Sequence, residues 1–222
     1  AHGTDGVAIF LGLAGDFCEN AGFKKITKRI LEKNIDVFLN FKLFKVLNQN
    51  FTSPYLFPLS TVYATLYLRN IIDINKEVIE ALIDKYFKYT YLFYANINNN
   101  CLLNGVAGNV NLLYSINKIY KDERCIKLAE EIGTYLMEIS HSNSRLAKWK
   151  TKEGYYLTGY SHGTASYANS LILIYQITQN EKFLKHALKA IQFDLNSYNK
   201  HFGEFYDYRY KPEVRFASTW AH

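Results

Sequence analysis

One short phrase returns along the chain, and it constrains the fold more than any other feature. It is a Gly-x-x-Gly-type step that opens an apolar run, at Gly3–Gly6 and again at Gly105–Gly108. Gly163–Ser166 and Pro58–Thr61 are altered copies of the same step. The copies recur roughly every 50 residues, a period typical of arrays of like structural units. We therefore expect repeats that start near residues 3, 58, 105 and 163, with a fifth repeat cut at residue 222.

Each repeat is predicted to hold two helices of different character. The first follows the step and is apolar nearly all round, which predicts burial, over 7–13, 62–68, 110–116 and 167–177. The second is amphipathic, as the stripe of Leu128, Ile132, Tyr135 and Ile139 illustrates. No strand-like alternation extends over any length. The prediction is an all-α chain of about four helix pairs, arranged as a closed α/α toroid with an inner and an outer ring. An open solenoid is the alternative.

The glycine steps suggest where a site would lie. We expect the second glycine of each step to let the inner helix begin tightly, with its first N–H groups facing the mouth of the ring. Several positive helix ends gathered at one mouth would suit an anion or an enolate. The alternative is that the glycines only permit close packing at a crowded rim.

Composition excludes several classes of protein. The chain has 222 residues, of which 49% are hydrophobic, enough for one large domain or an array. Its net charge of +6 comes from scattered lysines rather than a basic stripe, so we expect no nucleic-acid partner. No apolar run is long enough for a transmembrane segment. Three scattered cysteines and no recognisable signal peptide favour a reducing, cytoplasmic setting.

The stretch from Gly159 to Gly163 contains the strongest candidate for chemistry. His162 precedes the fourth step, at a junction between a loop and a helix. A histidine there can donate or accept a proton near neutral pH, as general acid catalysis requires. Cys101, four residues before Gly105, precedes the neighbouring inner helix, so a Cys–His nucleophile pair is possible.

Five motifs in order give the chain a resemblance to a known family. The whole chain resembles a LanC-like lanthionine cyclase domain, closest to the C-terminal cyclase domain of LanM-type (class II) lanthipeptide synthetases. The motifs are Gly3-Thr-Asp-Gly-Val-Ala-Ile-Phe-Leu, Asn104-Gly-Val-Ala-Gly, Gly159-Tyr-Ser-His-Gly-Thr-Ala, Phe205-Tyr-Asp-Tyr-Arg209 and Thr219-Trp-Ala-His222. Each is weak alone, and their common order makes the signal strong.

The resemblance implies a fold and a reaction. The family's fold is an α/α toroid of seven inner and seven outer helices, of which residues 1–222 would form a single, partial domain. Its members add a peptide cysteine to dehydroalanine or dehydrobutyrine and close thioether rings in lanthipeptide (lantibiotic) biosynthesis. A zinc ion held by Cys, Cys and His lowers the thiol pKa. The implied partners are a precursor peptide with dehydrated Ser or Thr and an N-terminal dehydratase domain in cis.

The same resemblance assigns roles to three positions. His162 falls on the family's active-site histidine and is a candidate proton donor to the enolate. Cys101 falls on the family's catalytic aspartate. Ala221 falls on the first zinc cysteine, and alanine does not bind zinc. The other two family ligands would follow residue 222. Zinc is therefore expected from the family, but no matching ligand is recognisable in this chain.

These departures leave three functional hypotheses. The first is a lanthionine cyclase, and the second is a degenerate, non-catalytic LanC-like scaffold that binds peptides without a zinc site. The third is an unrelated α/α toroid such as a glycoside hydrolase, for which Asp5, Glu204 and Asp207 are the only acids near the repeat mouths.

Several other roles follow from position alone. A three-His metal site would need His2, His162 and His222, which precede steps in different repeats. Asp5 is placed to cap its own helix. Asp207 and Arg209 are expected to form an ion pair, either a structural one or one at the lip of the site.

Overall fold

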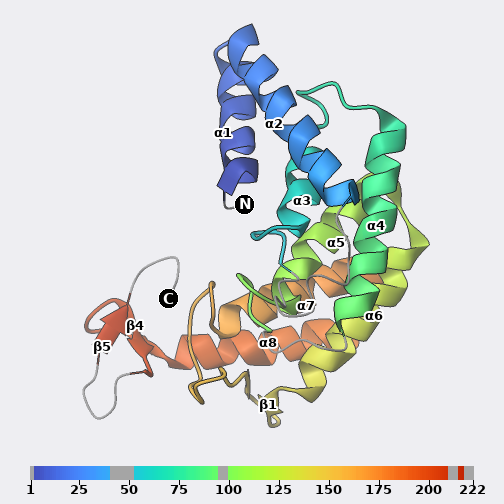
Figure 1. Cartoon of the computed structure of the whole chain (residues 1–222). Helices are drawn as coiled ribbons and strands as arrows, with labels where there is room; N and C mark the ends of the chain where they lie inside the picture. The colour runs from blue at the N-terminus through green and yellow to red at the C-terminus, as the bar shows by residue number, and fades with distance from the viewer. Residues whose placement is uncertain (1–2, 41–52, 95–99, 210–214, 218–222) are drawn as a thin grey trace. The chain divides into compact units, whose positions relative to one another are not determined.

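A computed structural model of the chain describes residues 3–40, 53–94, 100–209 and 215–217. The chain divides into two compact units, residues 1–97 and residues 98–222. Each unit consists mainly of two consecutive helix pairs (Figure 1). The units are described in turn.

The first unit contains α1 (Gly3–Phe17), α2 (Ala21–Asn40), α3 (Leu59–Leu68) and α4 (Lys76–Tyr94). Small residues on α1 allow its neighbours to approach closely. A Cβ atom at Gly12 would lie 2.7 Å from Cδ2 of Leu68 on α3, and one at Gly15 would lie 3.0 Å from Cβ of Phe23 on α2. Glycine at these two positions therefore sets the spacing between the helices.

A buried carboxylate joins three helices of the first unit. Asp5 on α1 is 3% exposed, and it accepts hydrogen bonds from Ser60 Oγ (2.6 Å) and Thr61 Oγ1 (3.0 Å) in the first turn of α3. Asn34 Nδ2 of α2 donates a further bond of 2.8 Å to Asp5. These partners of Asp5 lie on neighbouring helices, and its position is explained by packing rather than by capping of α1.

The second unit contains α5 (Val106–Tyr120), α6 (Glu123–Glu138), α7 (Thr164–Thr178) and α8 (Glu181–Asn196). α7 contacts the other three helices and is buried on most sides. α6 and α8 are amphipathic and begin at side-chain caps, where Asp122 accepts from the Arg124 N–H and Asn180 from the Lys182 N–H. The extensive burial of α5 and α7 agrees with their largely apolar sequences.

Short strands accompany these helices. β1 (His141–Ser142) pairs antiparallel with β2 (Ala147–Lys148) between α6 and α7. After α8, β3 (Tyr198–Asn199), β4 (Glu204–Asp207) and β5 (Arg215–Ala217) form an antiparallel sheet in that order. In its register Tyr198 faces Phe205 and Tyr206 faces Phe216. The strands occupy connections that the sequence periodicity left unassigned.

The all-α prediction is confirmed, with short strands added. The first helix of each pair begins at, or one residue after, the expected starts near 3, 58, 105 and 163. The ring arrangement of the pairs, the single partial domain and its fifth repeat stay predictions.

Two expectations need correction. Gly105 and Gly163, the first glycines of their steps, are the N-caps of α5 and α7, whereas Gly108 lies inside its helix. The second glycine, expected to let the helix begin tightly, thus lies in the first turn of α5, and the helix begins at the first glycine of the step. α1 is also less buried than expected, because α2 and α3 contact its small-residue side and leave Val7 and Phe10 49% and 69% exposed.

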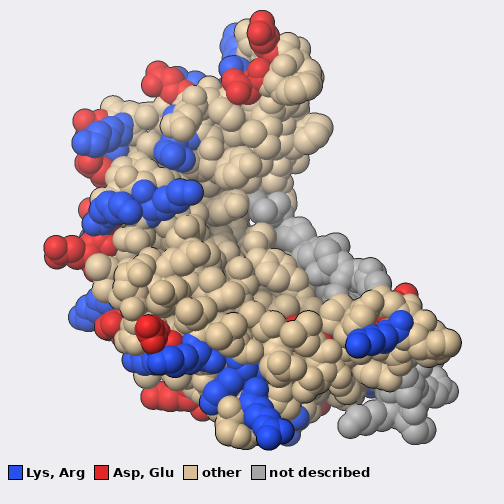
Figure 2. Space-filling model, turned by 180° about the vertical axis from the view of Figure 1, so that it is seen from behind, with Lys and Arg blue, Asp and Glu red and all other residues tan. Residues whose placement is uncertain are grey.

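Charged side chains are spread over the surface rather than gathered by sign. On the face drawn in Figure 2, Lys and Arg side chains alternate with Asp and Glu, and a broad area carries neither. Within the described parts of the chain, none of the helices combines the length and the apolar character that crossing a membrane requires.

Candidate functional site

A pocket of about 350 Å³ in the second unit contains the two site residues predicted there. It is formed by the turn before α5, the loop of residues 150–157, His162 just before α7, Tyr167 of α7 and Arg209 after β4. Its lining residues are Asn100, Cys101, Asn104, Lys150, Thr151, Lys152, Glu153, Tyr155, Leu157, His162, Tyr167 and Arg209.

His162 and Cys101 are in contact in this pocket. The distance from His162 Nδ1 to Cys101 Sγ is 3.3 Å, within hydrogen-bonding range for sulfur. The contact arises because α5 and α7 pack side by side, with Ser170 Oγ of α7 donating a 2.8 Å bond to the Ala107 carbonyl of α5. Residues that precede these two helices therefore meet. The predicted thiol–imidazole pair is present, although the sequence separates its members by 61 residues.

The loop that presents His162 is closed tightly on itself. The Thr164 N–H donates a 2.8 Å hydrogen bond to the Leu157 carbonyl across the loop. Gly159 has a φ of +89°, which favours glycine, and a Cβ atom at Gly163 would lie only 2.0 Å from the Thr158 carbonyl oxygen. The two glycines of the motif thus have a local cause, which is to let the backbone turn sharply just before α7.

Asp194 of α8 lies against this loop, and sequence reasoning missed it. Burial raises the pKa of Asp194 to about 7, while the backbone N–H groups of Gly159 and Ala165 pull that pKa in the opposite direction. Its Oδ1 atom is buried without a hydrogen-bond partner. A carboxyl group is therefore held in a poorly solvated place beside the segment that carries His162.

The surroundings of the Cys101 thiol favour its protonated form. Partial burial raises the pKa of Cys101, and the charge of Glu153 adds to that effect, whereas the backbone N–H groups of Asn104 and Leu103 oppose it. A protonated thiol does not replace the carboxylate that the family resemblance places there, because it carries no charge. It can still exchange a proton with the imidazole it touches.

Basic side chains outnumber acidic ones along the wall of the pocket. Lys150, Lys152 and Arg209 line it together with one acid, Glu153. The backbone N–H of Glu153 itself and the side chain of Thr151 lower the pKa of Glu153 most, and the charges of Lys152 and His162 add to that effect. This excess of positive charge is suited to a group that becomes negative during a reaction.

An aromatic stack supports one side of the pocket. Tyr167 of α7 lines it and stacks on Trp149 with ring centroids 4.5 Å apart and an interplanar angle of 5°. Trp149 Nε1 donates a 2.7 Å hydrogen bond to the Leu136 carbonyl near the end of α6, and its ring meets His186 edge-on. Sequence reasoning missed Trp149. The signal that could have identified it is a single tryptophan among polar residues shortly before the Gly159 motif.

The remaining predicted positions fall in different places. Arg209 lines the pocket, and Thr158 Oγ1 donates a 3.1 Å bond to the Tyr206 carbonyl, which ties the Phe205–Arg209 motif to the His162 loop. The side chain of Asp207 lies outside the described residues, so its ion pair with Arg209 stays a prediction. The positions of Ala221, His2 and His222 are also outside the described residues, as is the three-His site.

The described residues do not supply a complete zinc site. Nowhere among residues 3–40, 53–94, 100–209 and 215–217 do three His, Cys, Asp or Glu side chains lie close enough together to hold a metal ion. Cys101 and His162 offer two suitable donors, one fewer than the protein ligands of a typical catalytic zinc ion. The pair alone therefore does not fit the zinc centre expected from the family.

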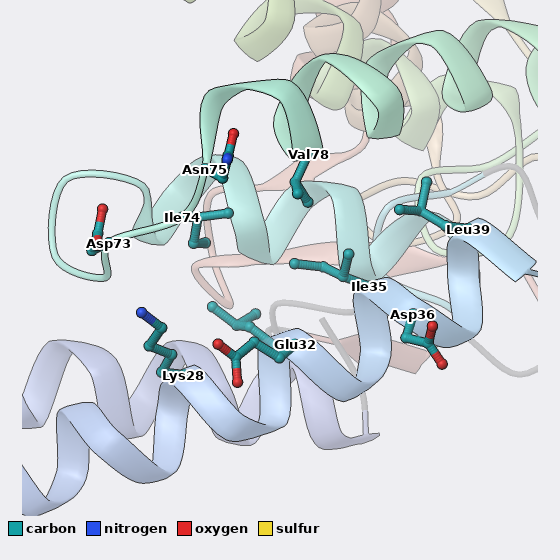
Figure 3. A pocket seen from close by; sticks show the side chains of 10 residues that line it. Lys28, Glu32, Ile35, Asp36, Leu39, Asp73, Ile74, Asn75 and Val78 are labelled. Carbon is teal, nitrogen blue, oxygen red and sulfur yellow. The ribbon is translucent and has the colours of Figure 1, made fainter.

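The first unit has a separate groove of about 590 Å³ between α2 and the start of α4 (Figure 3). Ile35 and Leu39 of α2 and Ile74 and Val78 near α4 give it apolar sides. Its charged side chains are Lys28, Glu32, Asp36 and Asp73. None of the residues that line this groove is a cysteine or histidine, so the thiol–imidazole chemistry belongs to the pocket of the second unit.

Fold and pocket together define a class: a protein of consecutive helix pairs with a thiol–imidazole pair where two buried helices, α5 and α7, begin. The family model described as "Lanthionine synthetase C-like protein" matches residues 1–222, and the chain belongs to this family. No curated protein and no solved structure matches the chain. Members of the family act on modified precursor peptides and are generally zinc-dependent, and the match points to a function of the lanthionine cyclase type.

Proposed function

We propose that this chain is part of the cyclase domain of a LanM-type lanthipeptide synthetase. It would add cysteine thiols of a precursor peptide to dehydroalanine or dehydrobutyrine residues and so form thioether rings. The observation that carries the proposal is the position of His162 just before α7, in a pocket whose charged side chains are mainly basic. The family match over residues 1–222 supports the reaction class.

The pocket suits the second half of that reaction. When a thiolate attacks the β-carbon of a dehydroamino acid, negative charge develops on the adjacent carbonyl as an enolate. Lys150, Lys152 and Arg209 lower the energy of that charge, as preorganised cations do in other active sites. His162 then delivers a proton to the α-carbon and completes the addition. Zinc activates the peptide thiol in the family, and no step is assigned to zinc in the described residues of this chain.

The proposed reaction also implies a substrate and a partner domain. The substrate is a precursor peptide that holds dehydrated Ser or Thr together with free Cys. A dehydratase domain in cis would prepare that peptide, and the reaction would take place in the cytoplasm. His162 is the proton donor, and Cys101 stands where the family has its catalytic aspartate.

A specific observation favours a second candidate, a peptide-binding scaffold without catalysis. Cys101 does not supply the negative charge of an aspartate, because burial raises its pKa. The described residues also lack a group of three metal ligands. Such a scaffold would bind the dehydrated peptide in the same pocket and leave its thiols free.

A thiol-consumption assay separates the two candidates. The full-length protein is incubated with a synthetic peptide that holds one dehydroalanine and one cysteine, and the remaining thiol is counted by alkylation and mass spectrometry. A cyclase consumes the thiol, and His162→Asn slows the loss by roughly 100-fold or more. His201→Asn, which alters an exposed histidine between β3 and β4, is the matched control and leaves the rate unchanged. Peptide binding without thiol loss in the native protein would establish the scaffold instead.

A further inference from the structure

The three cysteines of the chain have very different surroundings. Cys18 is exposed just after α1, and Cys125 is buried in α6, where burial raises its pKa to about 12. Cys101 alone among them lies in a pocket and touches a histidine. A thiol in that setting has both access for a small molecule and a base within reach.

The geometry of the pair defines how a proton would move. In the tautomer that carries its proton on Nε2, His162 Nδ1 can accept the thiol hydrogen across the 3.3 Å contact. Burial holds Cys101 in its protonated form, so its reactivity depends on that transfer. The resulting imidazolium stands beside the sulfur, ready to return the proton.

The pocket also restricts what can react. Its volume of about 350 Å³ is near the lower end for ligand sites, which suits one or two residues of a peptide. Lys150, Lys152 and Arg209 favour an electrophile that becomes anionic when the sulfur attacks it. Alkenes conjugated to a carbonyl behave in this way, because attack converts the carbonyl to an enolate.

We propose that Cys101 and His162 form a covalent acceptor site for α,β-unsaturated carbonyl compounds, the chemical class of dehydroalanine. The Cys101 S–H bond breaks, and its proton passes to His162. The sulfur bonds to the terminal alkene carbon as the carbon–carbon π bond opens. His162 returns the proton to the α-carbon, so the product is a neutral thioether and no oxidant or reductant is needed. The identity of the natural electrophile as a dehydrated peptide rests on the proposed function, whereas the chemistry of the pair does not.

Intact-mass analysis of the full-length protein tests this site. Cys18→Ser removes the exposed thiol, and the protein is then incubated with methyl 2-acetamidoacrylate, a small dehydroalanine analogue. We expect one added probe molecule, which peptide mapping places on Cys101, and a rate at least about tenfold above that of the His162→Ala variant. His201→Ala is the matched control, with an unchanged rate. Circular dichroism confirms that each variant is folded.

The possible results are distinct. Absence of an adduct on Cys101, or an equal rate in the His162→Ala variant, would overturn the proposal. Adduct formation without peptide cyclisation would support the covalent site and refute the cyclase. Peptide cyclisation without an adduct would support the cyclase and refute the covalent site. Cys101→Ser is expected to abolish the adduct, and labelling of that variant elsewhere at the same rate would also count against the site.

Discussion

The carbonyl of Thr158 lies directly against the α-carbon of Gly163, where a Cβ atom would be 2.0 Å from the oxygen and 2.2 Å from the carbon. Real Cβ atoms do not come this close to other heavy atoms, so only glycine fits without a backbone shift. The residue before this glycine is His162. The same contact therefore closes the loop and fixes the start of α7, where the proposed proton donor sits.

Gly163→Ala is expected to lower the free energy of unfolding by about 3 kcal/mol, because the methyl group forces the loop away from Thr158. Urea titration measures the change. Gly22→Ala on α2 is the matched control, since its Cβ would meet only the Asn20 side chain at 3.1 Å. Alanine there is expected to change stability by no more than about 1 kcal/mol. Equal effects of the two substitutions would show that the Thr158 contact is unimportant.

The helix pairs could be predicted because periodic information in the sequence specifies them. The glycine steps and the uniformly apolar runs after Gly105 and Gly163 led directly to α5 and α7. The meeting of Cys101 with His162 followed from placing both before neighbouring inner helices. Such inferences succeed where one local rule decides the structure.

The rest of the site depends on connections that have no period. Lys150, Lys152 and Glu153 reach the pocket through a loop whose path is set by tertiary contacts. Asp194 lies on an amphipathic helix, where an acid normally indicates solvent exposure. The strands β3 to β5 are two to four residues long, too short for alternation to be recognised.

Asp194 is expected to make stability depend on pH. Its folded-state pKa is raised from an ordinary value of 3.8 to about 7, so the folded protein keeps a proton that the unfolded chain has lost between these values. Stability from this group is therefore greatest at low pH and is lost as pH rises through that window. Relative to Asp194→Asn, the native protein should gain roughly 2–3 kcal/mol between pH 8 and pH 5. A difference between the two proteins that stays constant across pH would contradict this.

Removal of the Asp5 carboxylate is expected to destabilise the first unit strongly. Asp5→Ala removes the carboxylate that accepts from Ser60, Thr61 and Asn34, at a cost of about 2–4 kcal/mol in the free energy of unfolding. Asp16→Ala is the control, because Asp16 is exposed and pairs only with Lys24 at the surface, where a loss of less than about 1 kcal/mol is expected. Chemical denaturation measures the loss of unfolding free energy in both variants. Similar losses in the two variants would refute the role given to Asp5.

Two substitutions of Trp149 separate its polar and apolar contributions. Trp149→Phe keeps a ring against Tyr167 but loses the hydrogen bond to the Leu136 carbonyl. This loss is expected to lower the free energy of unfolding by about 1–2 kcal/mol. Trp149→Ala also removes the ring and should lower stability by about 3–5 kcal/mol. Thermal and urea unfolding provide the comparison. If Phe and Ala gave the same loss, the stack would have no role in holding α7.

The most direct test of the central claim concerns the proton that His162 delivers. The synthetic peptide with one dehydroalanine and one cysteine is cyclised by the full-length protein, and the configuration of the new α-carbon is determined by chiral chromatography after hydrolysis. Delivery from one fixed imidazole predicts a single configuration, and His162→Asn should give little product, with both configurations present. A His162→Asn protein that forms the same single isomer at the native rate would contradict the account.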